Sequence, residues 1–246
     1  MQFRLCESNT PAEAYKSNEL LRLFYTDRVE KDFFSSSDGW VKADAGTVGE
    51  WSAIGYLAGN EISERKGIAV GVIACYQGAS VIESWVPAGA FESRGTGVPP
   101  EQRFVDHTHE RYGAWNGDGF LYENALSQVI PYSLSGVVWY QGESDVSAEE
   151  GAVYADELRA LIDVWRNDFR DPRLPFVVIQ IADHVSKNRP GWTLVQAAQA
   201  EVGETVEGVK TVVCRDICEN IPIHPPSKLV LSARVAQALA ELSEKS

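Results

Sequence analysis

The residues best suited to chemistry in this chain directly follow a strand-like apolar run. Aliphatic and aromatic residues fill most of positions 136–140, and a polar cluster follows at once with Gln141, Gly142 and Glu143. An apolar run of this length is typical of a buried strand. Because ligands of open α/β sheets bind at the carboxyl ends of the strands, we expect these polar residues to line a site.

Two further segments could supply other groups of a hydrolytic site. His224 stands between Ile223 and two prolines, whose restricted backbone would hold an imidazole on a stiff loop, where it could act as a general base. Gly78 closely follows the apolar run 71–74, and without a Cβ its N–H could approach a developing oxyanion. Ser80 is a weak candidate for the nucleophile, since its segment lacks the second glycine of a nucleophile elbow.

The elements that must position these residues alternate along the sequence. Short apolar runs predict strands at 69–74, 136–140, 176–181 and 209–214, and apolar spacings of three or four predict helices at 52–66, 120–129, 149–169, 193–202 and 227–244. Strands that alternate with helices are typical of parallel βαβ units, so we expect an α/β fold. The segment 87–119 is rich in Gly and Pro with little periodicity, which predicts a long surface loop.

Composition narrows the functional classes. The 246 residues carry a net charge of -13, which argues against nucleic acid and anionic membranes as general partners. No apolar run reaches the roughly 20 residues that span a bilayer, and the start does not resemble a signal peptide. The four Cys and four His residues lack metal-site spacing, so we predict buried free thiols, no metal and no cofactor. No repeat or long linker interrupts the chain, which favours one domain over residues 1–246.

Five segments in order resemble one family, the sialate O-acetylesterase and related carbohydrate acetylesterase group of the SGNH/GDSL hydrolase superfamily. The resemblance covers nearly the whole chain. Its segments are Gly-Ala-Ser-Val-Ile-Glu-Ser-Trp (78–85), Trp-Tyr-Gln-Gly-Glu-Ser (139–144), Leu-Ile-Asp-Val-Trp-Arg (161–166), Pro-Phe-Val-Val-Ile-Gln (175–180) and Ile-His-Pro-Pro (223–226). It implies a three-layer α/β/α sandwich with a parallel central sheet, of the flavodoxin-like type.

The resemblance also implies a serine esterase mechanism that acts on an O-acetylated sugar or glycan. A serine hydroxyl would attack the acetyl carbonyl while His224 accepts its proton. The oxyanion would be held by the Gly78 N–H and a side-chain amide, for which Gln141 is the candidate, and Gly142 is expected to contribute to the same substrate-binding segment. His224 would then protonate the departing sugar hydroxyl and activate the water that hydrolyses the acetyl-enzyme.

The chain departs from this pattern at the nucleophile. The family's serine lies in a Gly-Gln-Ser-Asn-Met block at the end of the first strand, and the spacing to residues 21–24 aligns Met1 with the last residue of that block. We therefore expect the serine and the first strand to lie upstream of Met1. Loss of a central strand would expose ladder groups on its neighbours, which favours homo-oligomerisation. The alternative is that Ser8, in Cys-Glu-Ser-Asn-Thr (6–10), is a diverged nucleophile behind a short strand at 1–5.

A second departure concerns the acid that orients the histidine. The superfamily usually has Asp three residues before the histidine, but that position is Ile221 here. Glu219 is the nearest acid in the sequence, and Glu143 could reach the site from the other loop. A backbone carbonyl alone could also orient His224, as in a dyad. Of these, Glu143 is our candidate for the catalytic acid.

These features leave three functional hypotheses. The leading one is a carbohydrate O-acetylesterase of the sialate type. An acetylxylan esterase is the alternative, since an acidic protein has no general attraction for anionic sialic acid. A local arginine in the long loop, such as Arg94, Arg103 or Arg111, could still bind that carboxylate. The missing serine and the altered acid support a third hypothesis, a catalytically inactive glycan-binding homologue.

Overall fold

The computed structural model describes residues 4–26, 39–105, 109–184, 189–219 and 223–244. All the strands and helices expected from the apolar patterns are present. The strands are β1 (Asn18–Tyr25), β2 (Val41–Ala43), β3 (Val70–Ala74), β4 (Val137–Trp139), β5 (Phe176–Ile179) and β6 (Val209–Val212). The α-helices are α1 (Ala53–Lys66), α2 (Phe120–Asn124), α3 (Ala148–Asp168), α4 (Trp192–Thr205) and α5 (Leu229–Ser243). Within these ranges no helix has the length and apolar character needed to cross a membrane.

The strands form two groups rather than one continuous sheet. Strands β1 and β3 pair in parallel, from Leu21 beside Val70 to Tyr25 beside Ala74. Strand β2 joins the outer edge of β1 in the antiparallel direction, while the central strand pairs are parallel as expected. Strands β4, β5 and β6 form the second, parallel group. Among the described strands, β3 and β4 therefore end the two groups without a ladder between them.

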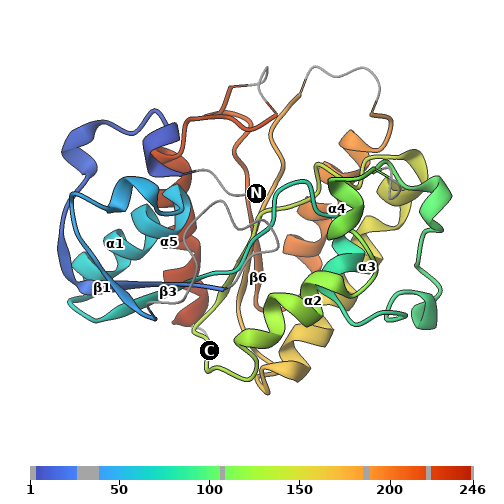
Figure 1. The fold of residues 1–246 in the computed structure, drawn as a ribbon, viewed down its shortest axis with the longest axis horizontal. Coiled ribbons are helices and arrows are strands. Elements are labelled where there is room, and N and C mark those ends of the chain that lie inside the picture. The colour runs from blue at the N-terminus through green and yellow to red at the C-terminus, as the bar shows by residue number, and fades with distance from the viewer. Residues whose placement is uncertain (1–3, 27–38, 106–108, 185–188, 220–222, 245–246) are drawn as a thin grey trace.

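Helices cover the strands on both faces, which confirms the three-layer α/β/α arrangement. Helix α1 packs against β1 and β3, while α5 packs against β5 and β6. Figure 1 shows α1 and α5 on one side of β6 and α2, α3 and α4 on the other. Helix α1 also packs along α5. The two strand groups are thus joined through one helical layer.

Capping residues fix the start of two helices beside the strand ends. The Ser52 hydroxyl accepts a hydrogen bond from the Gly55 N–H at the start of α1 (3.2 Å). At the start of α3, Ser147 and Glu150 form a capping box. The Ser147 N–H donates to the Glu150 carboxylate, and the Glu150 N–H donates to the Ser147 hydroxyl, each at 3.0 Å. The polar segment that follows β4 is therefore held at one end by the strand and at the other by this cap.

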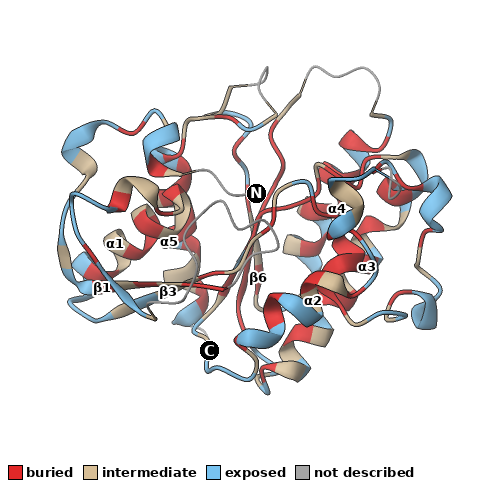
Figure 2. Cartoon of the chain, in the orientation of Figure 1, coloured by how far each residue is buried: buried red, intermediate tan, exposed pale blue. Residues whose placement is uncertain are grey.

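The core is most complete around the second strand group. All four residues of β5 are buried, and so are Leu158, Leu161 and Val195 on the flanking helices. Figure 2 shows buried residues gathered where α3 and α4 face the central strands. Burial of each large apolar side chain stabilises the fold by about 1.5–3 kcal/mol. This packing holds the carboxyl ends of β4 and β5 in fixed positions.

Two expectations from the sequence need correction. The segment 87–119 is not a surface loop throughout, because Phe91 and Trp115 are buried in the core. Its Arg103 lies in the interior, with Nε 2.8 Å from a carboxylate oxygen of Glu83. The four cysteines are free, but only Cys214 is buried, while Cys75 and Cys218 are partly exposed and Cys6 is exposed.

Candidate active site

The loop after β3 carries Gly78 and is held by buried side chains. Ala79 has a φ of +51°, a left-handed conformation that costs a residue with a Cβ about 1–2 kcal/mol. The fully buried Asn116 holds this conformation: its Nδ2 donates to Ala79 O (2.8 Å), and its Oδ1 accepts from the Val81 N–H (2.9 Å). The segment 87–119 therefore fixes the shape of the Gly78 loop.

Gly78 itself borders open space. No described heavy atom lies within 4 Å of the place where its Cβ would stand, and its φ lies outside the left-handed region. Packing therefore does not require this glycine, and its role as an oxyanion donor through its N–H stays a prediction. Ser80 differs, because its buried hydroxyl donates to Gln77 O (3.0 Å) and accepts from Trp85 Nε1 (3.0 Å).

The side chain of Gln141 ties the carboxyl ends of β3 and β4 together. Its amide donates to Ser80 O (2.8 Å) and to a carboxyl oxygen of Asp145, while its Oε1 accepts from the Tyr154 hydroxyl (2.9 Å). The donors and the acceptor of this amide are thus engaged inside the protein. In this geometry Gln141 positions the Gly78 loop. Its role as an oxyanion donor stays a prediction. In that role the Gln141 amide would first have to release one of these hydrogen bonds.

Gly142 is required by the backbone and by packing. Its φ is +135°, and a Cβ would stand 2.8 Å from Val195 Cγ1 and 3.1 Å from Gln199 Nε2. Gln199 also donates to Gln141 O (2.8 Å) and accepts from the Ile181 N–H (2.8 Å). The turn after β4 is therefore fixed on α4. The Cβ position of Gly142 faces α4. The predicted part of Gly142 in substrate binding would therefore be played by its backbone N–H or C=O group.

His224 and Glu143 come from two different loops and interact electrostatically. Although the His224 side chain reaches solvent, neighbouring protein atoms partly desolvate the imidazole, which is the largest cause of its lowered pKa. The Glu143 carboxylate opposes this effect and raises the pKa of His224, but the net shift is downward. A lowered pKa keeps the imidazole neutral near pH 7, as a general base requires.

Ser8 lies close to the His224 loop, but its hydroxyl is engaged within its own turn. The Ser8 Oγ lies 2.7 Å from Thr10 Oγ1 and 2.6 Å from a backbone carbonyl, and it accepts from the Thr10 N–H at 3.2 Å. The next residue, Asn9, donates its N–H to Pro226 O (3.0 Å). The segment is thus held beside the His224 loop, whereas the Ser8 hydroxyl bonds to its neighbours in sequence.

The alternative acid, Glu219, is also engaged. Its Oε1 accepts from the Ser227 hydroxyl (2.7 Å) and from Asn9 Nδ2 (3.1 Å). Burial raises the pKa of this carboxyl, but the hydrogen bonds outweigh burial and the net shift is downward. Ile221, which occupies the usual position of the acid, lies outside the described residues. Of the two acids, Glu143 is the one whose charge raises the pKa of His224, and its Oε1 is buried without a hydrogen-bond partner among the described residues.

A group of buried acids lies behind Gln141. Asp145, Glu83 and Glu157 are almost fully shielded from solvent, with Arg103 among them. Burial, reinforced by mutual repulsion, raises the pKa of Asp145 well above its ordinary range, that of Glu83 to about 7 and that of Glu157 to about 10. Across the described ranges, no group of three or more His, Cys, Asp or Glu residues is arranged to hold a metal ion.

Glu157→Gln is expected to flatten the pH dependence of stability. Both Glu157 carboxyl oxygens are buried without a hydrogen-bond partner among the described residues. The unfolded chain ionises this group near 4.5, but the folded chain holds the proton to about pH 10, so stability falls as the pH rises through this window. The variant should gain several kcal/mol at pH 8 and little at pH 4.5 in urea unfolding. Exposed Asp163→Asn on α3 is the control, and equal gains at both pH values would contradict the prediction.

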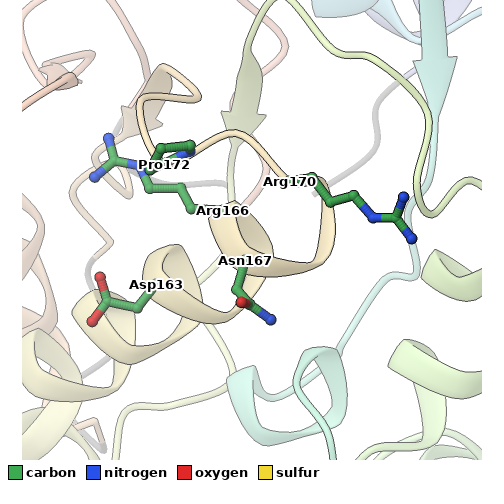
Figure 3. Close-up of a pocket in the computed structure, with 5 residues that line it drawn as sticks. All are labelled: Asp163, Arg166, Asn167, Arg170 and Pro172. Carbon is green, nitrogen blue, oxygen red and sulfur yellow. The ribbon is translucent and has the colours of Figure 1, made fainter.

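A surface hollow of about 500 Å³ lies at the far end of α3 from these residues. Figure 3 shows its lining residues, Asp163, Arg166, Asn167, Arg170 and Pro172. Arg166 donates to Leu174 O (3.1 Å) and to Glu207 O (2.7 Å), so its guanidinium holds the backbone there. Helix α3 starts after the carboxyl end of β4 and leads back to the start of β5. The hollow is therefore at the opposite edge from the candidate site.

Three buried residues that hold the site were missed as site residues from the sequence: Asn116, Tyr154 and Gln199. Tyr154 lies on the buried face of α3, and its hydroxyl is a signal that a buried partner is needed. Gln199 carries the same signal, as an amide at helical spacing between the apolar residues Val195 and Val202. Asn116 stands in a segment without periodicity, and nothing in its surroundings indicates that it is buried.

Comparison with known proteins connects this geometry with a family. Residues 8–241 match the family described as carbohydrate esterase, sialic acid-specific acetylesterase. The human sialate O-acetylesterase is 24% identical over 261 residues, which cover 95% of this chain and 48% of the human protein. A probable carbohydrate esterase from Arabidopsis thaliana is 24% identical over 235 residues, which cover 93% of this chain and 77% of that protein.

Solved structures agree on the fold. A carbohydrate acetylesterase from Xanthomonas citri has a TM-score of 0.83 at 23% identity, covering 100% of this chain and 55% of that one. A protein from Arabidopsis thaliana has a TM-score of 0.59 at 19% identity, covering 95% of this chain and 85% of that one. The chain spans about half the length of the sialate O-acetylesterases that it matches. With the match over residues 8–241, the chain belongs to the carbohydrate esterase family of sialic acid-specific acetylesterases.

Proposed function

We propose that this chain forms most of the active site of a carbohydrate O-acetylesterase with a serine-histidine mechanism. The observation that carries the proposal is the electrostatic interaction of His224 with Glu143, which follows the carboxyl end of β4. Glu143 follows β4, and the Gln141 amide joins this segment to the Gly78 loop after β3. A neutral imidazole, an acid and a glycine N–H are the parts that acyl transfer needs besides a nucleophile.

In the proposed reaction a serine oxygen bonds to the acetyl carbonyl carbon while His224 accepts the hydroxyl proton. The carbonyl electron pair moves to the oxygen, which accepts a hydrogen bond from the Gly78 N–H. When this intermediate collapses, the bond to the sugar oxygen breaks and the His224 imidazolium protonates that oxygen. Water then attacks the acetyl-enzyme with the same proton transfers, which releases acetate and restores the serine. Glu143 stabilises the imidazolium that forms in each step.

We place the nucleophilic serine in polypeptide upstream of Met1. The Ser8 hydroxyl is engaged with Thr10 in its own turn, and the Ser80 hydroxyl is buried between Gln77 and Trp85. Either serine would have to give up these bonds before its proton could pass to His224. The alignment of Met1 with the Gly-Gln-Ser-Asn-Met block supports the same placement.

Acetate release by this chain and by a chain extended upstream tests both parts of the proposal. The substrates are O-acetylated sialic acid and acetylated xylan, and we expect activity in the extended form alone. Activity in neither form would overturn the esterase proposal and favour a glycan-binding homologue. Activity of the 246-residue chain that disappears in Ser8→Ala would overturn the upstream nucleophile.

We propose an ester of sialic acid as the substrate, with Arg189 as the partner of its carboxylate. Arg189 Nη1 lies 3.4 Å from Glu143 O, and its guanidinium carbon lies 5.0 Å from the ring centroid of Phe104 and 5.3 Å from that of Trp192. These contacts support the proposal, because they hold a cation against the backbone of the residue proposed as the acid. Arg103, one of the arginines expected from the sequence, is buried in ion pairs and is not available to a substrate.

Arg189→Ala should therefore raise the KM for O-acetylated sialic acid about tenfold in the active, extended chain, since it removes a charge-assisted hydrogen bond. The KM for acetylated xylan should change little, because xylan lacks the carboxylate. Steady-state acetate release with both substrates measures this difference. The exposed Arg94→Ala is the matched control, and equal changes for both substrates would contradict the assignment.

A further inference from the structure

Two of the four cysteines share one turn that follows β6. The strand ends at Val212, and the turn is closed by a hydrogen bond from the Cys218 N–H to Cys214 O (2.9 Å). In a helical turn of this kind the first and last Cα atoms lie about 6 Å apart, within the range of about 4.4–6.8 Å that a disulfide spans. The two thiols also interact through a side-chain hydrogen bond. The pair can therefore close to a disulfide with little movement of the backbone.

The two thiols differ in exposure. Cys214 is 0% exposed, and its thiol donates to Gln180 O at 3.2 Å, whereas Cys218 is partly exposed. An oxidant in solution can therefore reach Cys218, while the shielded sulfur of Cys214 can react only with a neighbouring group. Oxidation-sensitive cysteines combine an accessible thiol with a second thiol that resolves the oxidised form. This difference indicates that Cys218 is the thiol that is attacked and Cys214 the one that resolves.

A buried lysine acts on this pair electrostatically. Lys228 is 1% exposed, and its Nζ lies 5.3 Å from the ring centroid of Tyr140. The hydrogen bond with Cys214 is the largest cause of the lowered pKa of Cys218, and the Lys228 charge lowers this pKa further, although burial and nearby carboxylates act in the opposite direction. More of this thiol is therefore ionised at neutral pH than is usual for a cysteine. The thiolate is the form that attacks a peroxide.

The remaining two cysteines lack this activation. Cys6 is exposed, but desolvation and the Glu50 carboxylate raise the pKa of its thiol. Burial raises the pKa of Cys75 to about 12. Exposure alone would make Cys6 the most reactive thiol of the chain, whereas thiolate character favours Cys218. The order in which the thiols react therefore distinguishes activation by the surroundings from simple access.

The same turn also contacts the loop that carries His224. The Cys218 thiol donates to Ser227 O (3.6 Å), and the next residue, Glu219, accepts from the Ser227 hydroxyl (2.7 Å). A disulfide has no S–H group, so oxidation removes the first of these bonds. It also removes the thiolate charge that stabilises the ammonium group of Lys228, the residue after Ser227. Oxidation of the pair would therefore weaken the contacts that hold the His224 loop.

We propose that Cys214 and Cys218 are a hydroperoxide-sensitive dithiol, which closes to a disulfide and changes the contacts of the His224 loop. The Cys218 sulfur bonds to one oxygen of hydrogen peroxide while the O–O bond breaks, which gives a sulfenic acid and one water. The Cys214 sulfur then bonds to the Cys218 sulfur while the S–O bond breaks, and the hydroxyl group leaves with the Cys214 proton as a second water. The two thiols lose two electrons in total, and one peroxide is reduced to two waters. The disulfide rests on the two thiols alone, whereas its effect on acetate release rests on the proposed function.

The test exposes the 246-residue chain to hydrogen peroxide, blocks the remaining thiols with N-ethylmaleimide and digests the protein with trypsin for mass spectrometry. Trypsin cleaves after Arg215, which stands between the two cysteines, so the disulfide links the peptides 211–215 and 216–228. We expect this link to form at least about tenfold faster than the Cys6 thiol is lost, because Cys218 holds more thiolate. Absence of the link, or faster loss of Cys6, would overturn the dithiol.

Variants separate the roles of the residues. Cys214→Ser should leave Cys218 as a sulfenic acid that dimedone captures, whereas Cys218→Ser should leave Cys214 reduced. Lys228→Met keeps the length of the buried side chain without its charge and should slow oxidation of Cys218 about tenfold. Lys210→Met, at a partly buried lysine of β6, is the matched control and should keep the parent rate. Equal rates in the two lysine variants would contradict the activation of Cys218, and the link in the parent chain tests the dithiol even if a variant fails to fold.

NMR signals of the His224 imidazole test the effect on the loop without any activity. They should shift when the 246-residue chain is oxidised and return with dithiothreitol, while the signals of the exposed His109 stay in place. The Cys218→Ser variant should show no shift under the same treatment. A complete disulfide with unchanged His224 signals would overturn the effect on the loop.

Acetate release by the chain extended upstream separates this proposal from the proposed function. Oxidation should lower kcat about tenfold, because the imidazole moves from its working position, and dithiothreitol should restore it. The Cys218→Ser variant should keep its activity under peroxide. Linked peptides without acetate release in either redox state would support the dithiol and contradict the esterase proposal. Acetate release without linked peptides would support the esterase proposal and overturn the dithiol.

Discussion

In the chain extended upstream of Met1, His224→Ala is expected to lower kcat for acetate release by about three orders of magnitude. The imidazole accepts the serine proton in the proposed mechanism, and alanine leaves no group that could replace it. Because the side chain is exposed, the variant should keep the melting temperature of the parent. His109→Ala is the matched control, since His109 is also exposed and stacks on Tyr112 at 4.7 Å in the long loop. A loss of less than tenfold would exclude His224 as the base.

The pH dependence of kcat/KM is a second test of the role of His224. Since the pKa of His224 is lowered, kcat/KM should fall only as the pH drops through a value below 6.5. Glu143→Gln removes a negative charge that raises this pKa, so it should move the acidic limb to still lower pH. Glu219→Gln should leave the limb in place, because that carboxylate bonds to Ser227 and Asn9. NMR titration of the imidazole in the 246-residue chain measures the same shifts without activity, and the reverse pattern would make Glu219 the orienting acid.

The elements that could be predicted from the sequence are those whose signal is local. Helix α3 shows apolar residues at spacings of three or four and begins at a capping box formed by Ser147 and Glu150. Strand β5 is an uninterrupted apolar run because both of its faces are buried. Strand β2 has no such signal, since it covers only Val41–Ala43 and depends on pairing with β1. Its place in the fold is set by tertiary contacts.

The residues of the candidate site also divide into those with a local sequence signal and those whose place is set by tertiary contacts. Gly78, Gln141 and His224 could be found because they stand next to strand ends or in a motif of restricted backbone. The acceptors of the Gln141 amide could not, since one of them is Ser80 O, on a segment far away in the sequence. The sequence predicts that Arg103 is a free cation in a loop, but Arg103 is buried beside Glu83. This burial depends on how two distant segments pack, which no local pattern shows. Sequence patterns show which groups are present, whereas packing decides which of them remain available.

Gly142 and Gly78 illustrate this difference, because both are expected to belong to the group that binds the oxyanion or the substrate. Gly142→Ala is expected to lower the free energy of unfolding by about 3 kcal/mol or more. Its φ of +135° is strained for any residue with a Cβ, and that Cβ would stand 2.8 Å from Val195 Cγ1, well inside contact distance. Urea unfolding of the 246-residue chain, followed by tryptophan fluorescence, should show a lower midpoint with an unchanged slope.

Gly78→Ala is the matched variant, with the same added methyl group on the other side of the site. No described atom lies within 4 Å of its Cβ position, so the free energy of unfolding should change by only about 0.5 kcal/mol. In the extended chain the added methyl group should instead crowd the N–H that holds the oxyanion, and kcat should fall by about tenfold or more. Equal losses of stability in the two variants would show that Gly78 is also required by the fold, and would remove the reason for assigning it to the chemistry.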